Sequence, residues 1–455
     1  MKKTLKQLAT WLNTEQLGFG DVLVTGISID TRTIQKGDLF VPFRGEQVNG
    51  HKFVEQAFAK GASASLWMKD EPNPPAGVPL LFVDDAEQAL QQMARSYRAE
   101  HKAKFIGITG SNGKTSSKDI LASTLSPFFK VQKTIGNFNN QLGLPITILQ
   151  LDEDTEVAVL EMGMSGFGEI ALLTNLAKPH FAVITNIGEA HMQDLGSREG
   201  IAKAKFEIVE GLGEDGILFY DGDEPLLQSP VASKPSLLVK SFGLEEKNTL
   251  YAMNIEETEN GSRFSVHGAI EGAFTISVLG KHQVKNTLGA MLIAQALGLS
   301  NEQIRQALQH VKLTDMRMQL VPGTNGALFI NDAYNAAPTS MKAALQFIHM
   351  SNLRPEKWLV LGDMLELGDN EQQFHAALAE EIDPTVIQYA CLYGPRMQFL
   401  AEKLAVKMEP TRLIYSKDDY TPIIEKLKND ASEQSLILLK GSRGMKLENV
   451  LQAFQ

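Results

Sequence analysis

The apolar positions of the chain follow two patterns, and the change from one to the other divides the sequence. Up to about residue 100, short apolar runs such as 38–42 and 79–83 alternate with helical spacing and a proline-rich loop. This pattern is typical of a small α/β module. From residue 104 onward, continuous apolar runs alternate with helical stretches. Because such runs are buried on both faces, they predict parallel strands in a doubly wound sheet.

Three strands of that sheet are predicted at 105–109, 157–160 and 181–185, and each is followed by a polar segment that contains glycine. Parallel sheets of this kind bind ligands at the carboxyl ends of their strands, so we expect the functional site there.

A second set of apolar runs, at 327–331, 357–361 and 435–439, follows a predicted helix near 300–311. The sequence therefore predicts an α/β protein of three domains. Their boundaries are expected at 1–100, 101–313 and 314–455.

Composition narrows the function further. Of 455 residues, 43 are Lys or Arg and 54 are Asp or Glu, so the formal net charge is 43 − 54 = −11. Nucleic-acid binding needs a surplus of cations to neutralise phosphates, so we expect no nucleic-acid partner. The single cysteine, Cys391, excludes an intrachain disulfide, and we interpret it as a buried residue rather than a nucleophile. No run approaches 18 consecutive apolar residues, so we expect no membrane span and a cytoplasmic location.

The strongest chemical signal is a glycine-rich segment at 107–115, Gly-Ile-Thr-Gly-Ser-Asn-Gly-Lys-Thr, between a predicted strand and a predicted helix. Backbone N–H groups of such a loop, together with the helix N-terminus, bind phosphate. Ile108 departs from the usual phosphate loop, and the dinucleotide-binding fingerprint fits less well. We predict that Lys114 contacts the β- and γ-phosphates of a nucleoside triphosphate and that the Thr115 hydroxyl binds Mg²⁺. The predicted ATP-binding residues of the loop are Gly110, Ser111, Asn112, Gly113, Lys114, Thr115 and Ser116.

Two further candidates follow the next two predicted strands. Glu161 comes directly after one strand and His191 after the other. Carboxylate oxygens suit Mg²⁺, so Glu161 is a predicted metal ligand, and His191 suits the same cluster although imidazole is a less usual partner. Taken singly, either residue could instead be a capping or hydrogen-bonded residue. Their place beside the phosphate loop favours the metal site.

These motifs and later ones resemble, in order, those of the Mur ligase family of ATP-dependent amide-bond-forming enzymes. The resemblance covers the whole chain and accounts for Ile108. It is carried by Thr-Gly-Ser-Asn-Gly-Lys-Thr at 109–115, Glu-Met-Gly-Met-Ser at 161–165, Asn-Ile-Gly-Glu-Ala-His at 186–191 and Lys-Gly-Ser-Arg-Gly-Met at 440–445. It implies an N-terminal UDP-sugar-binding module, a central P-loop-type ATPase domain and a C-terminal Rossmann-like ligase domain, with ATP and Mg²⁺ as cofactors.

The resemblance also implies roles for later residues. Asn286 matches the position that contacts adenine, while Gln283 stands where the family has an asparagine. Lys205 matches a lysine that related ligases carry as an N-carboxylated residue, whose carbamate would join the catalytic and metal site with Lys114, Glu161 and His191. Burial beside an apolar helix face would favour that modification. Three further ATP-binding positions are implied: Arg317, Asp332 and Asn335.

Within the family, the segment at 28–32 resembles the UDP-binding module shared by the tripeptide-forming ligases and those that add D-alanyl-D-alanine to UDP-N-acetylmuramoyl-tripeptide. The segment at 133–145 is similar to the latter branch. The implied reaction passes through an acyl phosphate and yields the pentapeptide precursor of peptidoglycan, ADP and phosphate. We expect both of these substrates as partners and a monomeric enzyme. The implied contacts to the UDP substrate are Ser28, Thr31, Arg32, Thr134, Asn137, Asn139 and Asn140.

Two alternatives stay open at this point. Folylpolyglutamate synthetase shares the ATP-binding core and the amide chemistry, but it lacks a dedicated N-terminal UDP module. A non-catalytic nucleotide-binding regulator would not need the intact set of Lys114, Glu161, His191 and Lys205. The release of ADP with and without both substrates would test the second alternative.

Overall fold

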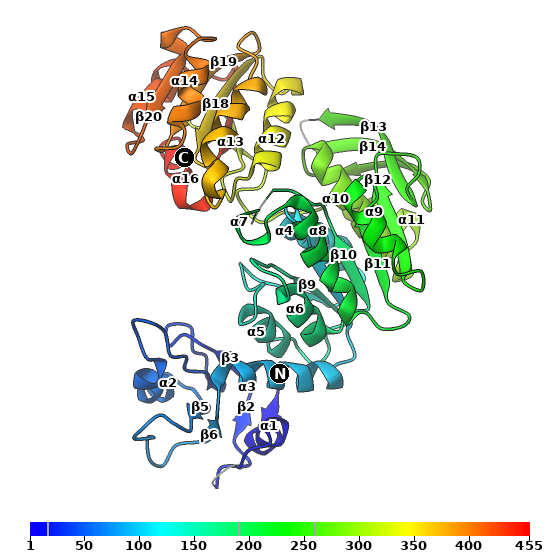
Figure 1. The fold of residues 1–455 in the computed structure, drawn as a ribbon, viewed down its shortest axis with the longest axis vertical. Helices are drawn as coiled ribbons and strands as arrows, with labels where there is room; N and C mark the ends of the chain where they lie inside the picture. Colours follow the sequence, from blue (N-terminus) through cyan, green and yellow to red (C-terminus); the bar gives the residue numbers. More distant parts are fainter. Residues whose placement is uncertain (16–17, 190–191, 259–260) are drawn as a thin grey trace. The chain divides into compact units, whose positions relative to one another are not determined.

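The structure of the chain, a computed structural model, describes residues 1–15, 18–189, 192–258 and 261–455 (Figure 1). The chain divides into two compact units. The first unit comprises Met1–Thr109, Phe128–Ala182 and Glu207–Ile217, and the second comprises Gly110–Pro127, Val183–Phe206 and Leu218–Gln455. Within the described residues, no helix has the length and apolar character needed to cross a membrane. The domain boundaries at 100 and 313 stay a prediction.

The N-terminal segment of the first unit contains a sheet of four parallel strands in the order β3-β4-β5-β6. These strands are β3 (Gly26–Ser28), β4 (Asp38–Phe40), β5 (Ala64–Met68) and β6 (Leu80–Val83). Its other elements are β1 (Lys3–Thr4), α1 (Leu5–Leu12), β2 (Leu23–Val24), a 3-10 helix (Gly50–Phe53), α2 (Val54–Ala59) and α3 (Ala86–Glu100). The strands predicted at 38–42 and 79–83 are thus confirmed as β4 and β6.

The largest sheet has nine strands in the order β15-β14-β13-β12-β11-β10-β7-β9-β8. The strands are β7 (Lys104–Thr109), β8 (Val131–Lys133), β9 (Val157–Glu161), β10 (Phe181–Ile184), β11 (Ile217–Asp221), β12 (Leu238–Gly243), β13 (Leu250–Thr258), β14 (Gly261–Gly268) and β15 (Gly272–Ile276). The pair β7–β9 is parallel, as the apolar runs predicted. Strand β8, which they did not predict, also pairs parallel with β9.

Helices separate the strands of this sheet along the chain. They are α4 (Lys114–Leu125), α5 (Gly143–Leu149), α6 (Glu169–Ala177), α7 (Met192–Leu195), α8 (Arg198–Phe206), a 3-10 helix (Glu207–Gly211), α9 (Pro225–Ala232), α10 (Lys281–Ala296) and α11 (Asn301–Leu308). The helix predicted near 300–311 is confirmed as α11, which begins where the Ser300 hydroxyl accepts a hydrogen bond from the backbone N–H of Gln303.

The sequence did not predict the antiparallel part of the nine-stranded sheet. Strand β14 pairs antiparallel with both β13 and β15. Its buried residues, such as Phe264 and Val266, alternate with more exposed ones, because one face of the strand lies against the core and the other faces solvent. A search for continuous apolar runs misses strands of this kind.

The C-terminal sheet has six strands in the order β16-β17-β21-β18-β19-β20, and β16 is its antiparallel edge strand. The strands are β16 (Gln319–Pro322), β17 (Leu328–Asn331), β18 (Glu356–Gly362), β19 (Ile387–Tyr393), β20 (Leu413–Ser416) and β21 (Ser435–Lys440). The α-helices are α12 (Pro338–Met350), α13 (Glu371–Ala377), α14 (Gln398–Leu404), α15 (Thr421–Asp430) and α16 (Glu448–Gln452), and the 3-10 helices are Gly368–Asn370, Leu378–Glu380, Pro410–Arg412 and Arg443–Met445.

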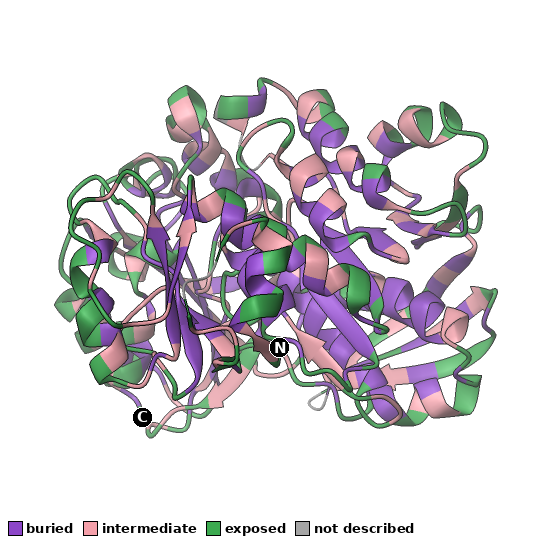
Figure 2. Ribbon diagram, turned by 90° about the horizontal axis from the view of Figure 1, so that it is seen from below, coloured by how far each residue is buried: buried purple, intermediate pink, exposed green. Residues whose placement is uncertain are grey.

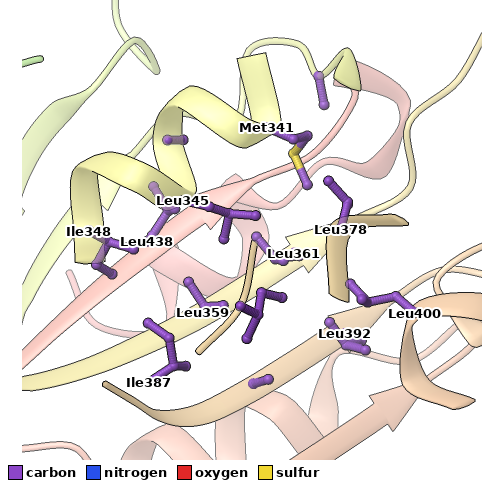
Figure 3. Close-up of a cluster of buried hydrophobic side chains, with 14 of the residues drawn as sticks. Met341, Leu345, Ile348, Leu359, Leu361, Leu378, Ile387, Leu392, Leu400 and Leu438 are labelled. Atoms are coloured by element: carbon purple, nitrogen blue, oxygen red, sulfur yellow. The ribbon is translucent and has the colours of Figure 1, made fainter. Parts of the chain in front are cut away.

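Both faces of this sheet are covered by apolar side chains. Leu359 and Leu361 of β18 join the core that contains Met341 of α12 (Figure 3). Trp358 and Val360, the alternate residues of the same strand, join a second core. Strand β21 is buried along its whole length. Figure 2, coloured by burial, shows strands in purple, the colour of buried residues. Burial on two faces explains the continuous apolar runs from which the sequence predicted β17, β18 and β21.

Candidate active site

The glycine-rich loop of the second unit joins Gly110 to α4 and depends on two glycines. Gly110 has φ +149°, and a Cβ there would lie 1.9 Å from Thr185 Oγ1. Gly113 has φ +78° and directly precedes α4, and a Cβ there would lie 2.9 Å from Asn286 Nδ2. Only glycine fits both the backbone conformation and the space at these positions. The backbone therefore turns tightly into the N-terminus of α4, as a phosphate-binding loop requires.

Residues after β10 hold this loop in place. Asn186 Oδ1 accepts a hydrogen bond from Asn112 N at 2.9 Å, and Asn186 Nδ2 donates to Asn112 O at 2.9 Å. Thr185 Oγ1 donates to the same carbonyl at 2.6 Å. No role was predicted for Thr185 or Asn186 from the sequence, although Asn186 opens the Asn-Ile-Gly-Glu-Ala-His motif. These hydrogen bonds hold the loop against the segment that follows β10.

Several polar groups of the loop fit an anionic ligand. Ser111 Oγ and Asn112 Nδ2 are buried and have no hydrogen-bond partner among the described residues. Lys114 Nζ donates to Gly110 O at 2.7 Å, so its ammonium lies across the loop. Leaving a buried polar group without a partner costs about 1–3 kcal/mol. Phosphate oxygens would satisfy these donors, and the loop residues therefore fit the triphosphate of ATP.

The second unit also brings distant predicted residues to the loop. Arg317 Nη2 donates to Thr115 Oγ1 at 3.0 Å, and the guanidinium lies 4.3 Å from the centre of the Tyr334 ring. Gln283 Nε2 donates to Ser116 Oγ at 3.3 Å. The replacement of an asparagine by Gln283 therefore keeps a contact with the phosphate loop.

Asn286 lies beside the same loop. Its side chain is buried, and Nδ2 donates to Gln283 Oε1 at 3.1 Å. The structure thus places Asn286 next to Gly113, and its contact with adenine stays a prediction.

Lys205 lies on α8 and is almost completely buried, with 2% of its surface exposed. Burial lowers the pKa of its ammonium well below the ordinary value, and the positive charge of Lys114 lowers it further. Lys203, two residues earlier on the same helix, is exposed. The expectation that Lys205 adjoins a buried helix face is therefore confirmed, and its modification stays a prediction.

Asp332 and Asn335 follow the end of β17. Asp332 Oδ2 accepts from Lys440 Nζ at 2.5 Å, and Asp332 Oδ1 accepts from Met318 N at 3.1 Å. Lys440 also donates to the backbone carbonyl of Asn335 at 3.2 Å. The sequence analysis did not single out Lys440, although it opens a motif that carries the resemblance. The exposed Asn335 side chain accepts a hydrogen bond from the backbone N–H of Ala336, as in a turn.

In the first unit, Glu161 ends β9 and is 3% exposed. Its Oε1 accepts from Asn139 Nδ2 at 2.9 Å, and its backbone N–H donates to Thr134 Oγ1 at 3.0 Å. Two residues predicted to bind the UDP substrate thus also hold Glu161 in position. Ile108 pairs with Glu161 across the sheet, so the carboxylate stands beside the strand that leads into the phosphate loop.

The remaining residues of the 134–140 loop serve its conformation. Asn140 Oδ1 accepts from the backbone N–H groups of Leu142 and Gly143, and therefore stabilises the start of α5. Asn137 is exposed, and its carbonyl accepts from Asn139 N.

A cavity of about 1160 Å³ lies in the first unit, and Ser28 lines it. Its lining also includes Asp30, Thr33, Ile135 and Phe138, which the sequence analysis did not assign. Ile135 is 72% exposed and Phe138 is 38% exposed, so apolar surface is presented to solvent there. Patterns of buried residues cannot reveal such exposed apolar residues, and only their position beside Thr134 gave a signal.

Thr31 and Arg32 belong to the turn after β3. Arg32 forms hydrogen bonds with both carboxylate oxygens of Asp30, and this pairing lowers the pKa of Asp30 to about 2. Thr31 Oγ1 donates to Gln56 Oε1 at 3.3 Å. Because 85% of the Arg32 side chain is exposed, its guanidinium is accessible to an anionic ligand.

His191 lies outside the described residues. Among the residues that are described, no group of three or more His, Cys, Asp or Glu side chains is arranged to hold a metal ion. The Thr115 hydroxyl and a carbamate on Lys205 are not covered by that finding, because neither is a His, Cys, Asp or Glu side chain. Cys391 is buried, and burial raises the pKa of its thiol to about 12, which agrees with its interpretation as a core residue.

Models of three protein domains match the chain. The model described as "Mur ligase family, catalytic domain" matches residues 23–98, and the Mur ligase middle domain matches residues 108–294. The model described as "Mur ligase, glutamate ligase domain" matches residues 316–443.

The chain is also similar over its full length to known proteins. It is 44% identical to the UDP-N-acetylmuramoyl-tripeptide–D-alanyl-D-alanine ligase of Bacillus subtilis, covering 99% of this chain and 98% of that protein. Its fold matches the crystal structure of MurF from Acinetobacter baumannii with a TM-score of 0.89 and 29% identity, covering 99% and 98% of the two chains. MurF from Thermotoga maritima, solved in complex with ADP, matches with a TM-score of 0.83 and 26% identity over 95% and 97%.

Proposed function

The chain belongs to the Mur ligase family, and from this premise we propose that it joins D-alanyl-D-alanine to UDP-N-acetylmuramoyl-tripeptide at the expense of ATP. The observation that carries this proposal is the 44% identity, over 99% of the chain, to a ligase of that name. The product is the pentapeptide precursor of peptidoglycan, with ADP and phosphate released.

The reaction needs activation because an amine cannot displace oxide from a carboxylate. A carboxylate oxygen of the tripeptide first attacks the γ-phosphorus of ATP, and the bond from that phosphorus to the ADP oxygen breaks. The amine nitrogen of D-alanyl-D-alanine then attacks the carbonyl carbon of the acyl phosphate. Collapse of the tetrahedral intermediate expels phosphate, and the nitrogen loses a proton to leave the amide.

The glycine-rich loop is the part of the chain that binds the triphosphate. Lys114 would neutralise charge on the transferring phosphoryl group, while Ser111 and Asn112 would donate to phosphate oxygens. The buried, unpartnered atoms of Ser111 and Asn112 support this role. Arg317 reaches the same loop at Thr115 and would add a second cation.

Mg²⁺ belongs to this proposal because the residues present suit a hard cation that is held mainly through phosphates. Thr115, Glu161, His191 and Lys205 in its carbamate form would hold it, and the ion would polarise phosphoryl oxygens. The neutral amine form that burial favours at Lys205 is the form that attacks CO₂. The carbamate would then turn a buried cation into an anion suited to a metal.

The cavity of the first unit is the proposed site of the UDP substrate. Ser28 and Asp30 supply polar groups, and the exposed Arg32 is hydrogen bonded to Asp30. Ile135 and Phe138 supply apolar surface for a ring. We propose domain boundaries at 100 and 313, which lie between the matched family domains.

We further propose a monomer in the cytoplasm. One chain matches all three family domains, so a single copy carries both the phosphate loop and the proposed UDP site, which supports the monomer. The cytoplasmic location is supported by the need for ATP and a UDP-linked substrate. Light scattering after size-exclusion chromatography should give a mass close to 50.0 kDa.

The decisive experiment is a ligation assay with Mg-ATP, D-alanyl-D-alanine and UDP-N-acetylmuramoyl-tripeptides that contain either diaminopimelate or lysine. We expect pentapeptide and ADP in equal amounts, and no ADP when either substrate is omitted. If ADP is released but no pentapeptide forms with either tripeptide, the proposed acceptor or donor is wrong. A parallel incubation with a folate and glutamate tests the other amide-forming reaction, for which we expect no product.

A further inference from the structure

Helix α4, which begins at the phosphate loop, carries a carboxylate that the mechanism does not use. Asp119 has no exposed surface, and its Oδ2 accepts two hydrogen bonds from Thr314, one from the backbone N–H at 2.8 Å and one from the hydroxyl at 2.7 Å. Its Oδ1 faces the ammonium of Lys118 at 3.8 Å. A buried carboxylate is unfavourable unless it is hydrogen bonded or paired. The buried position of Asp119 therefore indicates that its two hydrogen bonds with Thr314 have a specific structural role.

Thr314 belongs to the segment 313–318, the last part of the connection between α11 and β16. Three residues after it stands Arg317, whose Nη2 donates to Thr115 Oγ1. Thr115 and Asp119 both lie on α4. The segment is thus attached to the same helix at two points, once through Thr314 and once through Arg317.

The backbone around Arg317 is held in an unfavourable conformation. Met316 and Met318, its two neighbours, have φ values of +63° and +52°, a region that non-glycine residues rarely adopt. Tyr334 N donates to Met316 O at 3.2 Å, and Met318 N donates to Asp332 Oδ1 at 3.1 Å. Strained residues persist only where surrounding contacts fix them, and such strain gathers at functional sites. The contacts therefore hold the kink that directs Arg317 toward Thr115.

We propose that Asp119 and Thr314 are positioning residues that hold Arg317 at the phosphate loop. The two charge-assisted bonds at Asp119 fasten the start of the 313–318 segment to α4, and the kink then directs the guanidinium. Neither residue touches the nucleotide in this proposal, and both act through Arg317. The inference rests on the proposed function, because it assumes that ATP binds at this loop.

The test uses Thr314 rather than Asp119, because the buried carboxylate could be needed for folding. Thr314→Val removes the hydroxyl at an exposed position without a change in size, and Thr314→Ser restores it. The matched control is Ser123→Ala. Ser123 lies on the same helix, and its hydroxyl contacts the backbone of Lys312 at 3.4 Å. Along the chain, Lys312 precedes Thr314, whereas Arg317 follows it. Each full-length variant is measured for the Kd of a non-hydrolysable ATP analogue and the KM of both nucleotide substrates.

We expect Thr314→Val to raise the Kd of the ATP analogue about tenfold, since weakening one charge-assisted contact with a ligand changes its Kd by about that factor. The KM for the UDP substrate should not change. Thr314→Ser and Ser123→Ala should behave as the unchanged chain. In the background of Arg317→Ala, the same Thr314→Val substitution should have less than about a twofold effect, because the group that it positions is gone.

Equal effects of Thr314→Val with and without Arg317 would overturn the inference, as would unchanged analogue binding in Thr314→Val. A wrong proposed function would give a different result. In that case the unchanged chain would neither bind the analogue nor form pentapeptide. Thermal midpoints of all variants within about 2 °C of each other show that folding is not the cause, since exposed substitutions have small effects.

Discussion

Lys114 is the residue whose role is most directly set by its surroundings, because its ammonium already lies across the loop at Gly110 O. We expect Lys114→Ala to lower the ligation rate by on the order of 10³-fold, the upper range for loss of one electrostatic group. The thermal midpoint should change little, since substitutions of loop residues usually alter stability by about 0.5 kcal/mol or less. A variant that ligates at more than a tenth of the original rate would contradict the role in phosphoryl transfer.

The second prediction concerns the modification of Lys205. We expect Lys205→Ala to lose most of its activity and a small added carboxylic acid to restore part of it, because the acid can occupy the place of the carbamate. The control is Lys203→Ala, which changes an exposed residue of the same helix and should be mild. Normal ligation by Lys205→Ala in CO₂-depleted buffer would show that the metal site does not use this residue.

The lowered pKa of Lys205 also has a consequence for stability. In CO₂-depleted buffer, the unfolded chain binds a proton at this lysine more tightly than the folded chain does, so folding becomes more favourable as the pH rises toward the ordinary pKa of lysine, about 10.4. Lys205→Met removes the proton difference. The variant should therefore gain thermal midpoint relative to the unchanged chain at low pH, and this difference should narrow as the pH rises toward the ordinary pKa of lysine, about 10.4.

If the difference in thermal midpoint between Lys205→Met and the unchanged chain stays constant or widens as the pH rises, Lys205 is charged in the folded chain. The matched control is Lys203→Met, at an exposed residue of the same helix, whose midpoint should follow that of the unchanged chain at each pH.

Sequence motifs located the residues that touch phosphate but not the residues that position them. The loop at 107–115 is contiguous, so its spacing alone indicates its chemistry. Asp119 and Thr314 lie 195 positions apart, and no local pattern relates them. Thr134 and Asn139 were assigned to the UDP substrate, and their bonds to Glu161 became visible only when β8 and β9 were paired.

At the scale of helices and strands, the strands that could be predicted from the sequence were those buried on both faces. Strands buried on both faces, such as β7 and β21, produce apolar runs that can be recognised from the sequence. In strands β13, β14 and β15, buried residues are interrupted by exposed or half-buried ones. Examples of the latter are Met253, Arg263 and Thr275. These strands were therefore not predicted, although their pairing forms one edge of the nine-stranded sheet.

The segment after β8 gives a prediction at this scale. Because Ile135 is 72% exposed and lines the cavity of the first unit, Ile135→Asp should leave folding intact and add a negative charge where a diphosphate substrate is expected. We expect the KM for the UDP substrate to rise about tenfold or more, with the KM for ATP unchanged. The control is Val406→Asp, at a residue that is 83% exposed in the C-terminal segment.

Equal changes in both KM values for Ile135→Asp would indicate a general effect on the protein rather than a local one. Unchanged values would place the UDP substrate away from this segment. Arg32→Ala provides an independent check, since it removes the exposed cation of the same proposed site and should raise the same KM.

For the whole molecule, the two nucleotide ligands should leave separate signatures. The phosphate loop, Arg317 and Asn286 belong to the second unit, whereas the cavity with Ser28 and Ile135 belongs to the first. A ligand that binds only the folded form stabilises it by about 2.7 kcal/mol at 100 times its Kd. Amide exchange that requires release of the ligand then slows by about 100-fold.

Hydrogen-exchange mass spectrometry of the full chain tests this expectation. ADP should slow exchange in peptides that cover 110–125 and 313–319, because Thr115 and Asp119 attach that segment to α4. The UDP substrate alone should slow exchange in peptides that cover 26–38 and 133–139, which line or flank the cavity. Lys114→Ala should lose the ADP effect and keep the UDP effect. Protection of 110–125 by the UDP substrate without ADP, or of 26–38 by ADP alone, would contradict the assignment of the two ligands to these segments.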